Sequence, residues 1–583
     1  MKMTRIMSLL LVLVMIVSCL ASCNIGGGGN GGEGENNGDT NKPDKDNKPV
    51  TGGQGDKDED KFGTEDTGEA WLDDIAYEQT NLIFQMTHCS NNEELPSGCE
   101  RFLAGEKSES QFVDSLVQKR NENCYQATNV TVTYRYYDDV AATYGFSKCF
   151  DTIFSEVQNQ TSNSADMYCN FMTDMLVTSL KGSFANLYST KHGTGEYAGA
   201  NHFNLKDKGY MADLMGSLTL SAEKVYVVAS DYFIDLIRAF FIVPANVSLY
   251  NQIAADMIDD LNGDGDKNID DIFEEVWAGD WTYDRLAEYS AKIYQDNDTT
   301  PGDSIMDTLG FGLGINGLPA AGLVYTSSVK VINKEYKSDI EAYEYGYPDD
   351  NEALYTLAKN IKEKLVEKTG ITTVTSGDAS TVGETTPLLS IRNRFTNNKM
   401  LFGGIILVGS LEYEAYQGMK DGGGFAVLPV PLYEKTYGDD SKQDMYLTQI
   451  HVVGRAGGIS AKTTKFVQCS AFLQYQSSHS TDILNEYYDF NLTFDIANGV
   501  SGNVEMLKYI RENVRTSFDK LYEDAIGFLA PDGIELDERT RWHALICDSS
   551  YAVEDMRSLY DTYIDAKGES LTNLVGQYDS LPE

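Results

Sequence analysis

The sequence predicts a large protein of the α/β class behind an N-terminal leader. From Trp71 onward, strand-like apolar runs alternate with segments of helical periodicity, which is typical of strands and helices packed in layers. Hydrophobic residues make up 42% of the 583 residues and aromatic residues 11%. This content is enough to fill a large buried core, so a wholly disordered chain is excluded.

Five runs have the composition of strands. In the second of them, Val130, Val132, Tyr134 and Tyr136 alternate with polar residues, which is the period of a half-buried strand. The five predicted strands are Leu82–Met86, Val130–Tyr136, Val225–Ala229, Met400–Val408 and Phe425–Val430.

Four segments place apolar residues at helical spacing. The clearest one puts Leu354, Leu357, Ile361 and Leu365 on one face and stops at Gly370, a residue type that commonly ends helices. The other three faces consist of Phe466, Cys469 and Leu473, of Val504, Leu507 and Ile510, and of Val553, Met556, Leu559 and Tyr563.

The charge balance excludes one class of partner. Lys and Arg number 46 against 89 Asp and Glu, which gives a formal net charge of −43. A polyanion repels phosphate backbones, so we expect no nucleic-acid partner. We expect no enzyme either, because the sequence carries no nucleophile elbow, Walker loop or dinucleotide fingerprint, and its six histidines argue against a His-rich metalloenzyme.

The first 22 residues have the layout of a signal peptide. A cationic start precedes the apolar run Met7–Val17, which is too short to span a membrane. Leu20–Cys23 resembles the bacterial lipobox, in which the cysteine becomes the lipid-carrying first residue. We therefore expect a signal peptide at 1–22 and lipidation of Cys23, which would anchor the protein on the extracytoplasmic face of a bacterial cell membrane. A plain secretory signal with an unrelated cysteine is the alternative.

The composition of residues 23–68 predicts a disordered tether. The segment consists of Gly, Asn, Asp and Lys with almost no apolar residue, so it cannot bury surface. A flexible coil of this length reaches on the order of 35–40 Å from its anchor. Such a stalk would hold a globular body off a membrane.

A resemblance to a known family rests on six blocks in a fixed order. The blocks are Asp114–Asn121 before the Val130 strand, Lys224–Val228, Trp281–Leu286, Asp307–Gly312, Phe395–Phe402 with Gly409 and Ser410 after it, and Phe425–Pro431. Together they span about residues 80–565 and resemble the extracellular solute-binding proteins of ABC importers, family 1, the group that includes maltose-binding protein.

The resemblance implies a two-lobed periplasmic-binding-protein-like fold of type II, with lobes joined by several hinge crossings. We expect lobe I at 69–228 and 412–482 and lobe II at 229–411 and 483–583. A solute, expected to be a carbohydrate, would sit between the lobes, and closure would bury it for delivery to ABC permease subunits. The resemblance implies a monomer that requires no cofactor.

Candidate ligand-binding residues follow the strands that lead to the junction of the lobes. Sugar rings present C–H faces and hydroxyls, which suit aromatic rings and carboxylates. The candidates are His88 after the first strand, Asp231 and Tyr232 after the first crossing, Gly409, Ser410, Glu412 and Tyr413 after another crossing, and Trp542. Turn or loop residues without ligand contact are the alternative. Leu411 stands where maltose-binding protein has a stacking Trp. Trp281 is expected to pack at a helix start.

An acidic loop resembles the opening of an EF-hand calcium loop. Oxygen-bearing side chains spaced around a tight glycine turn can wrap Ca²⁺. The candidate ligands are Asp260, Asn262, Asp264, Asp266 and Asp271, with Asp in place of the usual last Glu. A solvated acidic turn is the alternative, and a bound calcium ion would be structural.

Seven cysteines follow Cys23, so they cannot all pair within the chain. Cys89 and Cys99 are close enough in sequence to close a small loop, whereas Cys469 lies on an apolar helical face and is expected in the core. Two functions from other classes stay open. A lipid-anchored glycan hydrolase would release products from oligosaccharides, and a surface glycan-binding adhesin would bind glycans without a transport role.

Overall fold

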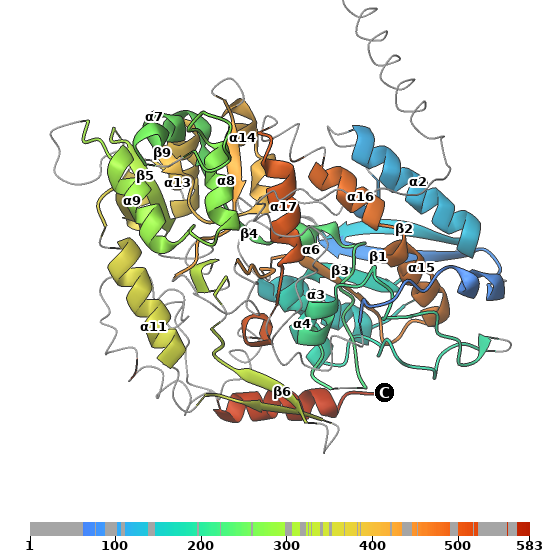
Figure 1. Ribbon diagram of the computed structural model, residues 1–583. Helices are drawn as coiled ribbons and strands as arrows, with labels where there is room; N and C mark the ends of the chain where they lie inside the picture. The colour runs from blue at the N-terminus through green and yellow to red at the C-terminus, as the bar shows by residue number, and fades with distance from the viewer. Residues whose placement is uncertain are drawn as a thin grey trace, which may run out of the picture. The chain divides into compact units, whose positions relative to one another are not determined.

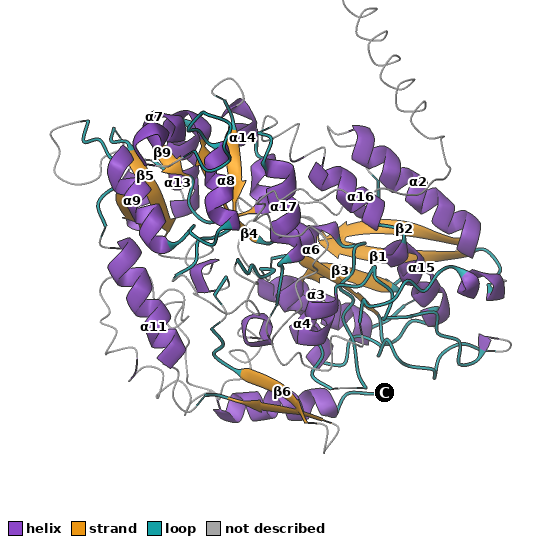
Figure 2. Ribbon diagram, in the orientation of Figure 1, coloured by secondary structure: helices purple, strands orange, loops and turns teal. Residues whose placement is uncertain are grey.

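The computed structural model describes residues 62–583 with gaps (Figure 1). The longest gaps are 88–101, 138–145, 298–305, 315–321, 434–445, 490–499 and 523–567, apart from single residues within the last two. The helices and strands form a mixed α/β fold with two main sheets and one two-stranded hairpin (Figure 2), which confirms the predicted class. The signal peptide, residues 23–61 of the predicted tether and the helix predicted at Val553–Tyr563 lie outside the described residues, apart from one residue of that helix. The end of the predicted tether, 62–68, is packed on the body instead of disordered, because Phe62 is buried and Gly63 N–H donates to Leu205 O at 3.0 Å.

The first sheet joins strands from both ends of the described chain. It contains β1 (Thr80–Thr87), β2 (Val130–Tyr137), β3 (Met167–Phe171) and β12 (Arg455–Ile459), in the order β12-β3-β1-β2. β1 pairs in parallel with β2 and β3, so the chain needs crossover helices, which are α2 (Gln111–Thr128) and α3 (Phe146–Gln158). β1 is buried from Leu82 to Thr87, as expected for a central parallel strand. The first two predicted strands are therefore confirmed.

The second sheet has six strands. They are β4 (Phe241–Asn246), β5 (Leu309–Gly314), β8 (Ile371–Val374), β9 (Met400–Phe402), β10 (Ile406–Leu407) and β11 (Phe425–Leu428). Their order is β10-β4-β9-β5-β8, and β11 also pairs with β4. β5 is parallel to β8 and β9, whereas β4 is antiparallel to β9, β10 and β11. The strand predicted around Phe425 is confirmed as β11.

Helices accompany both sheets. Those that precede or follow strands of the second sheet are α7 (Val247–Met257), α8 (Asp270–Trp277), α9 (Tyr283–Ile293), α11 (Glu352–Ile361), the π-helical turn η5 (Lys362–Val366), α12 (Ser376–Thr381), α13 (Pro387–Thr396), the 3₁₀ turn η6 (Val408–Glu412) and α14 (Glu414–Gln417). The others are η2 (Ala70–Asp74), α4 (Met172–Leu180), α5 (Ala212–Leu218), α6 (Ile234–Arg238), α15 (Phe466–Ser478), α16 (Thr481–Glu486) and α17 (Asn503–Glu512).

Three helices carry the apolar faces that the sequence predicted. They are α11 with η5, α15 and α17. At the start of α9, the Thr282 side chain accepts a hydrogen bond from the Arg285 backbone N–H at 3.3 Å and caps the helix. Trp281 before it is fully buried and donates its indole N–H to the Pro429 carbonyl at 2.8 Å. Trp281 therefore packs at a helix start.

The predicted strand Met400–Val408 is two short strands rather than one. Gly404 adopts a φ of +75°, in the left-handed region that glycine enters without steric strain. Gly403 approaches its neighbours so closely that an added Cβ would lie 2.8 Å from Cγ of Phe395. The two glycines bend the chain between β9 and β10, so the prediction of a continuous strand is wrong.

The predicted strand Val225–Ala229 is an extended buried segment that belongs to no named strand. It makes one bridge, in which Val228 N–H donates to Gly457 O at 2.8 Å and Gly457 N–H donates to Val228 O at 3.0 Å. Buried apolar residues give this segment the composition of a strand. Its pairing with Gly457 is an isolated bridge and does not continue as a ladder of backbone hydrogen bonds. The strand prediction is wrong here.

The chain passes between the sheets along paired segments. The outgoing segment 225–240 leads from the first sheet through α6 to β4, and the returning segment 446–454 leads to β12. His451 N–H donates to Ala239 O at 2.8 Å, and Phe240 bridges Ile450 in antiparallel fashion. A third passage follows α17, where Arg515 N–H donates to the Thr448 carbonyl at 2.7 Å.

Two further segments pack beside the first sheet's helices. The hairpin of β6 (Asn333–Lys337) and β7 (Ala342–Gly346) reaches α5, where the Tyr345 hydroxyl donates to Leu220 O at 2.9 Å. The helix at 568–579 packs near α4, since the Tyr578 hydroxyl donates to Lys224 O at 2.7 Å and Gln577 donates to Leu180 O at 2.9 Å.

Cys124, Cys169 and Cys469 are buried free thiols. Burial raises the pKa of Cys469 well above its usual value, which keeps the thiol protonated and unreactive. Cys89, Cys99 and Cys547, and the side chain of Cys149, lie outside the described residues. None of the helices in the described part of the chain combines the length and apolar composition that a membrane crossing needs.

Substitution of Gly457 should destabilise the protein, because an added Cβ would lie 2.3 Å from Cζ of buried Phe233. Overpacking of this kind costs roughly 1–3 kcal/mol, so Gly457→Ala should lower the unfolding free energy by that amount in a urea titration. Gly576→Ala is the matched control, because its Cβ meets nothing within 4 Å and it lies in a helix. The control should gain about 0.5–1 kcal/mol. Equal stability of the two variants would contradict the close packing at Gly457.

Candidate functional site

The carboxyl ends of parallel strands are where open α/β sheets place their ligands. At this edge of the first sheet, Thr87 ends β1 and Asn170 lies near the end of β3. The Thr87 hydroxyl donates to Asn170 Oδ1 at 2.6 Å, and the Asn170 amide donates to Asp174 Oδ2 at 2.8 Å. All three side chains are buried. This edge of the first sheet is therefore polar inside an apolar body.

The matching edge of the second sheet lies where β4 begins. Because β4 is antiparallel to β9, its first residue Phe241 is at the carboxyl edge of β9 and β5, and it pairs with Leu407 at the end of β10. α6 immediately precedes β4, and η6 immediately follows β10. Figure 1 shows α6 and β4 between the first-sheet strands and the remaining strands of the second sheet. The polar residues of α6 and η6 thus lie at the junction of the two sheets.

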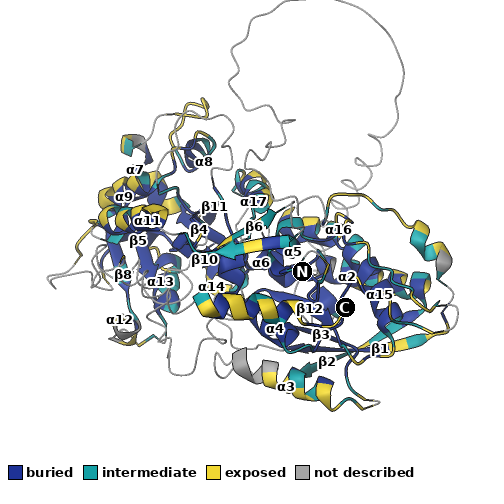
Figure 3. Cartoon of the chain, turned by 90° about the horizontal axis from the view of Figure 1, so that it is seen from below, coloured by how far each residue is buried: buried dark blue, intermediate teal, exposed yellow. Residues whose placement is uncertain are grey.

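Four charged residues form a buried network at this junction. Asp235 bonds Arg238 and also accepts from Arg455 Nη1 at 2.7 Å, and Arg238 donates to both oxygens of Glu412 at 2.8 Å. The side chains of Arg238, Asp235 and Arg455 are 0%, 4% and 1% exposed. We call these four residues the junction network. Its two positive and two negative charges balance, and Figure 3 shows α6 and β12 in the buried middle of the fold.

The environment of the junction network favours its ionised form. Burial alone would raise the pKa of Asp235, but the charges of Arg455 and Arg238 hold it below its usual value. The guanidinium carbons lie 5.2 Å from the ring centre of Phe102 for Arg238 and 4.8 Å from that of Phe171 for Arg455. These cation–π contacts add to the ion pairs in a site that excludes water.

The predicted site residue Glu412 is committed to the junction network. Besides Arg238, it accepts a short hydrogen bond from the Tyr487 hydroxyl. Gly409 and Ser410 are buried in η6 beside it, and Leu411 is fully buried. Tyr413 is partly exposed, and the guanidinium carbon of Arg392 lies 4.6 Å from its ring centre. Within this group, Tyr413 offers an aromatic ring that solvent reaches.

Asp231 and Tyr232 lie just before α6. Tyr232 is fully buried, with its hydroxyl 3.3 Å from that of Tyr134 and the Arg120 guanidinium 4.8 Å from its ring centre. Asp231 is partly exposed and accepts a hydrogen bond from Thr481 at 3.0 Å. Burial raises the pKa of Asp231 to about 7, against the hydrogen bond from Thr481 that lowers it.

The structure brings the two groups of predicted residues together around a pair of tyrosines. Tyr487 bonds Glu412, and Tyr488 bonds the Ile237 carbonyl. Burial raises the pKa of Tyr488, the charges of Arg511 and Arg238 oppose this rise, and those of Glu412 and Asp231 add to it. His88 and Trp542 lie outside the described residues, as does Cys23. Ligand contact by any of these side chains stays a prediction.

Sequence analysis missed the three residues that hold the junction together, Asp235, Arg238 and Arg455. A signal existed for the first two, because an Asp and an Arg interrupt the apolar run from Tyr232 to Val243. Charged residues are rarely buried unless they are paired, so such an interruption indicates a buried ion pair. Nothing in the sequence indicates that Arg455, more than 200 positions later, is the partner.

The acidic loop folds on its own carboxylates. Asp260 accepts backbone N–H bonds from Gly263 at 2.8 Å and Gly265 at 2.9 Å, and buried Asp271 accepts from Leu261 at 2.7 Å. Across the described ranges, no group of three or more His, Cys, Asp or Glu side chains is arranged to hold a metal ion. The loop with Asp260, Asn262, Asp264, Asp266 and Asp271 is therefore accounted for as a hydrogen-bonded turn, and calcium binding stays a prediction.

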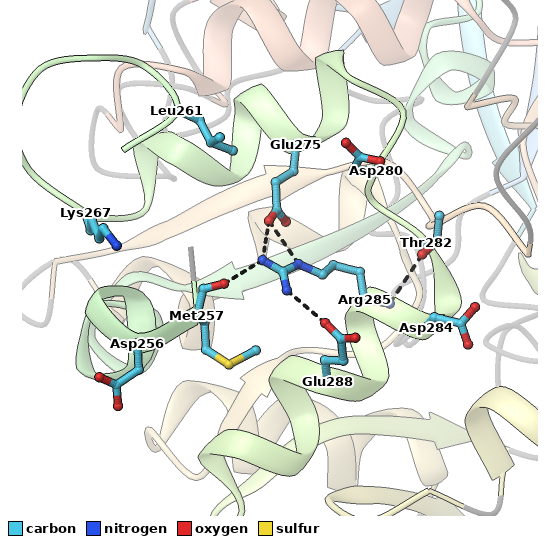
Figure 4. A pocket seen from close by; sticks show the side chains of 10 residues that line it. All are labelled: Asp256, Met257, Leu261, Lys267, Glu275, Asp280, Thr282, Asp284, Arg285 and Glu288. Atoms are coloured by element: carbon cyan, nitrogen blue, oxygen red, sulfur yellow. Dashed lines mark hydrogen bonds and ion pairs between the residues drawn. The ribbon is translucent and has the colours of Figure 1, made fainter. Parts of the chain in front are cut away.

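A cavity of about 460 Å³ borders this loop, away from the junction network (Figure 4). Arg285 lies in it and donates to Glu275 at 2.6 Å and Glu288 at 2.8 Å, and to the Met257 carbonyl at 2.8 Å. The remaining lining residues are Asp256, Leu261, Lys267, Asp280, Thr282 and Asp284. None of the predicted ligand-binding residues lines this cavity, and its arginine is already neutralised.

Comparison with known proteins gives structural likenesses only. The sequence matches no protein-family model and no curated protein. Solved structures similar to this chain include the GacH receptor of Streptomyces glaucescens, in complex with acarbose (11% identity, TM-score 0.42, 87% of this chain and 100% of that chain). Another is the galacto-N-biose/lacto-N-biose I-binding protein of an ABC transporter from Bifidobacterium longum (11% identity, TM-score 0.44, 86% of this chain and 98% of that chain). A third is the maltose-binding periplasmic protein of Listeria monocytogenes, in complex with maltose (11% identity, TM-score 0.44, 84% of this chain and 99% of that chain).

Removal of the central carboxylate should destabilise the fold strongly. Asp235→Asn leaves Arg238 and Arg455 buried without their shared counter-ion, and breaking a buried pair costs about 3–5 kcal/mol. The loss should appear in chemical unfolding at pH 7. Asp284→Asn is the control, because Asp284 is 63% exposed and pairs with Lys364, so its change should stay within about 0.5 kcal/mol. A loss no larger than that of the control would show that the network is not stabilising.

The raised pKa of Asp231 predicts a pH dependence of stability. The unfolded chain releases this proton near pH 4, whereas the folded protein holds it to about pH 7. The stabilisation is therefore complete below pH 4 and is lost as the pH rises through 7. Asp231→Asn mimics the protonated form, so its stability relative to the wild type should be clearly higher at pH 8 than at pH 5, where only part of the wild type's stabilisation has been lost. The same difference between variant and wild type at both pH values would rule out the shift.

The calcium prediction can be tested by thermal unfolding. If the acidic loop binds Ca²⁺, millimolar Ca²⁺ should raise the unfolding temperature relative to EGTA, and Mg²⁺ should not. Asp264→Asn should abolish the effect, because Asp264 is an exposed loop carboxylate. Identical unfolding temperatures in Ca²⁺ and EGTA would establish the loop as a turn alone.

Proposed function

We propose that this protein captures a solute, a carbohydrate, between two lobes and delivers it to an ABC permease. Lobe I would be built on the first sheet and lobe II on the second. The predicted lobe boundary at 412 would therefore move past β11, because Phe425–Leu428 pairs with β4 of the second sheet, and the helix at 568–579 would belong with lobe I. The observation that carries the proposal is the junction itself. Polar edges of two sheets meet there, and paired segments join the sheets.

The junction has the physical properties of a hinge. Within the described part of the chain, the passing segments are joined by few backbone hydrogen bonds, such as that from His451 N–H to Ala239 O, rather than by a wide continuous sheet. Bending at such segments lets two rigid halves approach each other. A bound solute that contacts both halves shifts the equilibrium towards the closed form, and a permease can recognise that form.

The chemistry of the junction supports a sugar as the solute. Sugars present apolar C–H faces that stack on aromatic rings and hydroxyls that bond carboxylates and amides. Tyr413 supplies a partly exposed ring near the junction, and Asp231 supplies a partly exposed carboxyl group. Tyr487 and Tyr488 are buried beneath them. This set contains the residue types that sequence analysis expected, at the place where the sheets meet.

The remaining parts of the proposal concern location. A signal peptide at 1–22, lipid on Cys23 and the tether at 23–68 would keep the receptor at the extracytoplasmic face of the cell membrane. A tether raises the effective concentration of the receptor near its permease. The proposal assigns no catalytic role to any residue and treats the protein as a monomer that requires no cofactor.

A ligand screen on the full-length protein tests the proposal. Neutral mono- and oligosaccharides, peptides and polyamines would be compared by thermal unfolding and calorimetry. A sugar at 100 times its dissociation constant adds about 2.7 kcal/mol to the unfolding free energy, so the unfolding temperature should rise by a few degrees. Tyr413→Ala should weaken sugar binding, whereas Tyr188→Ala, on an exposed ring, should not.

Two outcomes of this screen would contradict the proposal. A shift by peptides or polyamines but by no sugar would exclude a carbohydrate receptor. Release of shorter sugars from an oligosaccharide during incubation would show a hydrolase in place of a binding protein.

A further inference from the structure

Arg392 makes no ion pair with an acidic side chain among the residues that the structure describes. It lies on α13 and is partly exposed, but its Nε is buried and has no hydrogen-bond partner. In the described part of the chain, its guanidinium carbon lies 4.6 Å from the centre of the Tyr413 ring. In a chain with 89 acidic and 46 basic residues, an arginine without a carboxylate partner is unexpected.

A second hydrogen-bond donor without a partner lies beside Arg392. Tyr416 of α14 is 1% exposed, and its buried hydroxyl lacks a hydrogen-bond partner. Tyr416 N–H donates to the carbonyl of Tyr413, whose ring contacts Arg392, so the two residues lie in the same region. Burial raises the pKa of Tyr416, and the positive charge of Arg392 opposes this rise. The ring packs against Phe395 and Phe425 at centre distances of 6.0 and 5.8 Å, which fixes the hydroxyl in place.

The two groups call for a ligand that only accepts hydrogen bonds. A guanidinium has donors and no acceptors, and its planar fork matches the two oxygens of a carboxylate. An aromatic ring near the guanidinium face leaves the in-plane N–H donors available, because the bonds to a carboxylate lie in that plane. Buried donors without an acceptor are otherwise unfavourable, so a binding role explains why they are tolerated.

The position of the donors connects them to the junction. Tyr413 directly follows Glu412 of the junction network, and the Gln417 side chain of α14 donates to the Glu412 carbonyl at 3.2 Å. Arg392 therefore reaches the partly exposed end of η6 from the second-sheet side. A solute held at the junction can place one substituent against this arginine.

We propose that Arg392, supported by the Tyr416 hydroxyl, binds a carboxylate of the captured solute, so that the preferred ligands are acidic sugars such as uronic acids. This inference rests on the proposed function for the position of the ligand. The shared chemistry is the carboxylate, which an amino acid also supplies, and the test separates the two sources.

The test compares acid and neutral forms of the same sugar on the full-length protein. Calorimetry with galacturonate and galactose, with glucuronate and glucose, and with glutamate gives the affinities. We expect at least one uronate to bind at least tenfold more tightly than its neutral counterpart. Arg392→Gln should remove this preference, and Arg392→Lys should keep part of it. Arg135→Gln is the control and should keep all of it, because Arg135 lies on β2 of the first sheet and donates to Asn163.

A measurement on the unliganded variants separates binding from structure. Among the described residues, the Arg392 side chain makes the cation–π contact with Tyr413 and no ion pair, so Arg392→Gln should unfold within about 2 °C of the wild type. A much lower unfolding temperature would assign Arg392 a structural role and overturn the inference.

The outcomes distinguish this inference from the proposed function. If neutral sugars bind as tightly as uronates and Arg392→Gln changes neither, the carboxylate site is wrong and the carbohydrate receptor stands. If glutamate alone binds, and Arg392→Gln abolishes it, the carboxylate site is supported and the carbohydrate assignment fails. If no uronate binds more tightly than its neutral sugar, and glutamate does not bind, the inference is overturned.

Discussion

The rest of the structure depends on the buried ion pairs that Asp235 makes with two arginines. Asp235 lies between two buried arginines, Arg238 on the outgoing passage and Arg455 at the start of β12, which belongs to the first sheet. The contact with Arg455 therefore ties α6, which leads into the second sheet, to the first sheet. An uncompensated buried charge is so unfavourable that this arrangement tolerates no loss of one member. The network fixes how the two polar edges meet.

The proposed closure would divide these contacts between two parts of the molecule. Arg238 and Glu412 both lie beside the second sheet, so their bidentate pair would move with it. The Asp235–Arg455 contact and the backbone pairs of the passing segments connect this unit to the first sheet. Bending between the sheets would act on these few contacts, while the aromatic rings at the junction would open or close around a solute.

Periodicity in the sequence predicted the elements that local pattern decides. The apolar face of α11, the strand that begins at Val130 and the helix start after Trp281 are local features, and the structure has them. The predicted alternation in β2 is not seen as alternating burial, because most of its residues from Thr131 to Tyr137 are half-buried. The run at 225–229 failed because a short apolar segment has the same composition whether or not a sheet accepts it. The site was predicted only in outline. Residues after the crossings were found, but Glu412 bonds an arginine 174 positions away, and such long-range pairing leaves no local signal.

The most direct test of the account is the distance between the two halves, measured by double electron–electron resonance with labels at exposed Glu122 on α2 and Lys359 on α11. The account predicts that a bound sugar shortens the mean distance and narrows its distribution. An unchanged distribution with the sugar bound, in a sample shown by calorimetry to be saturated, would contradict capture by closure of two halves.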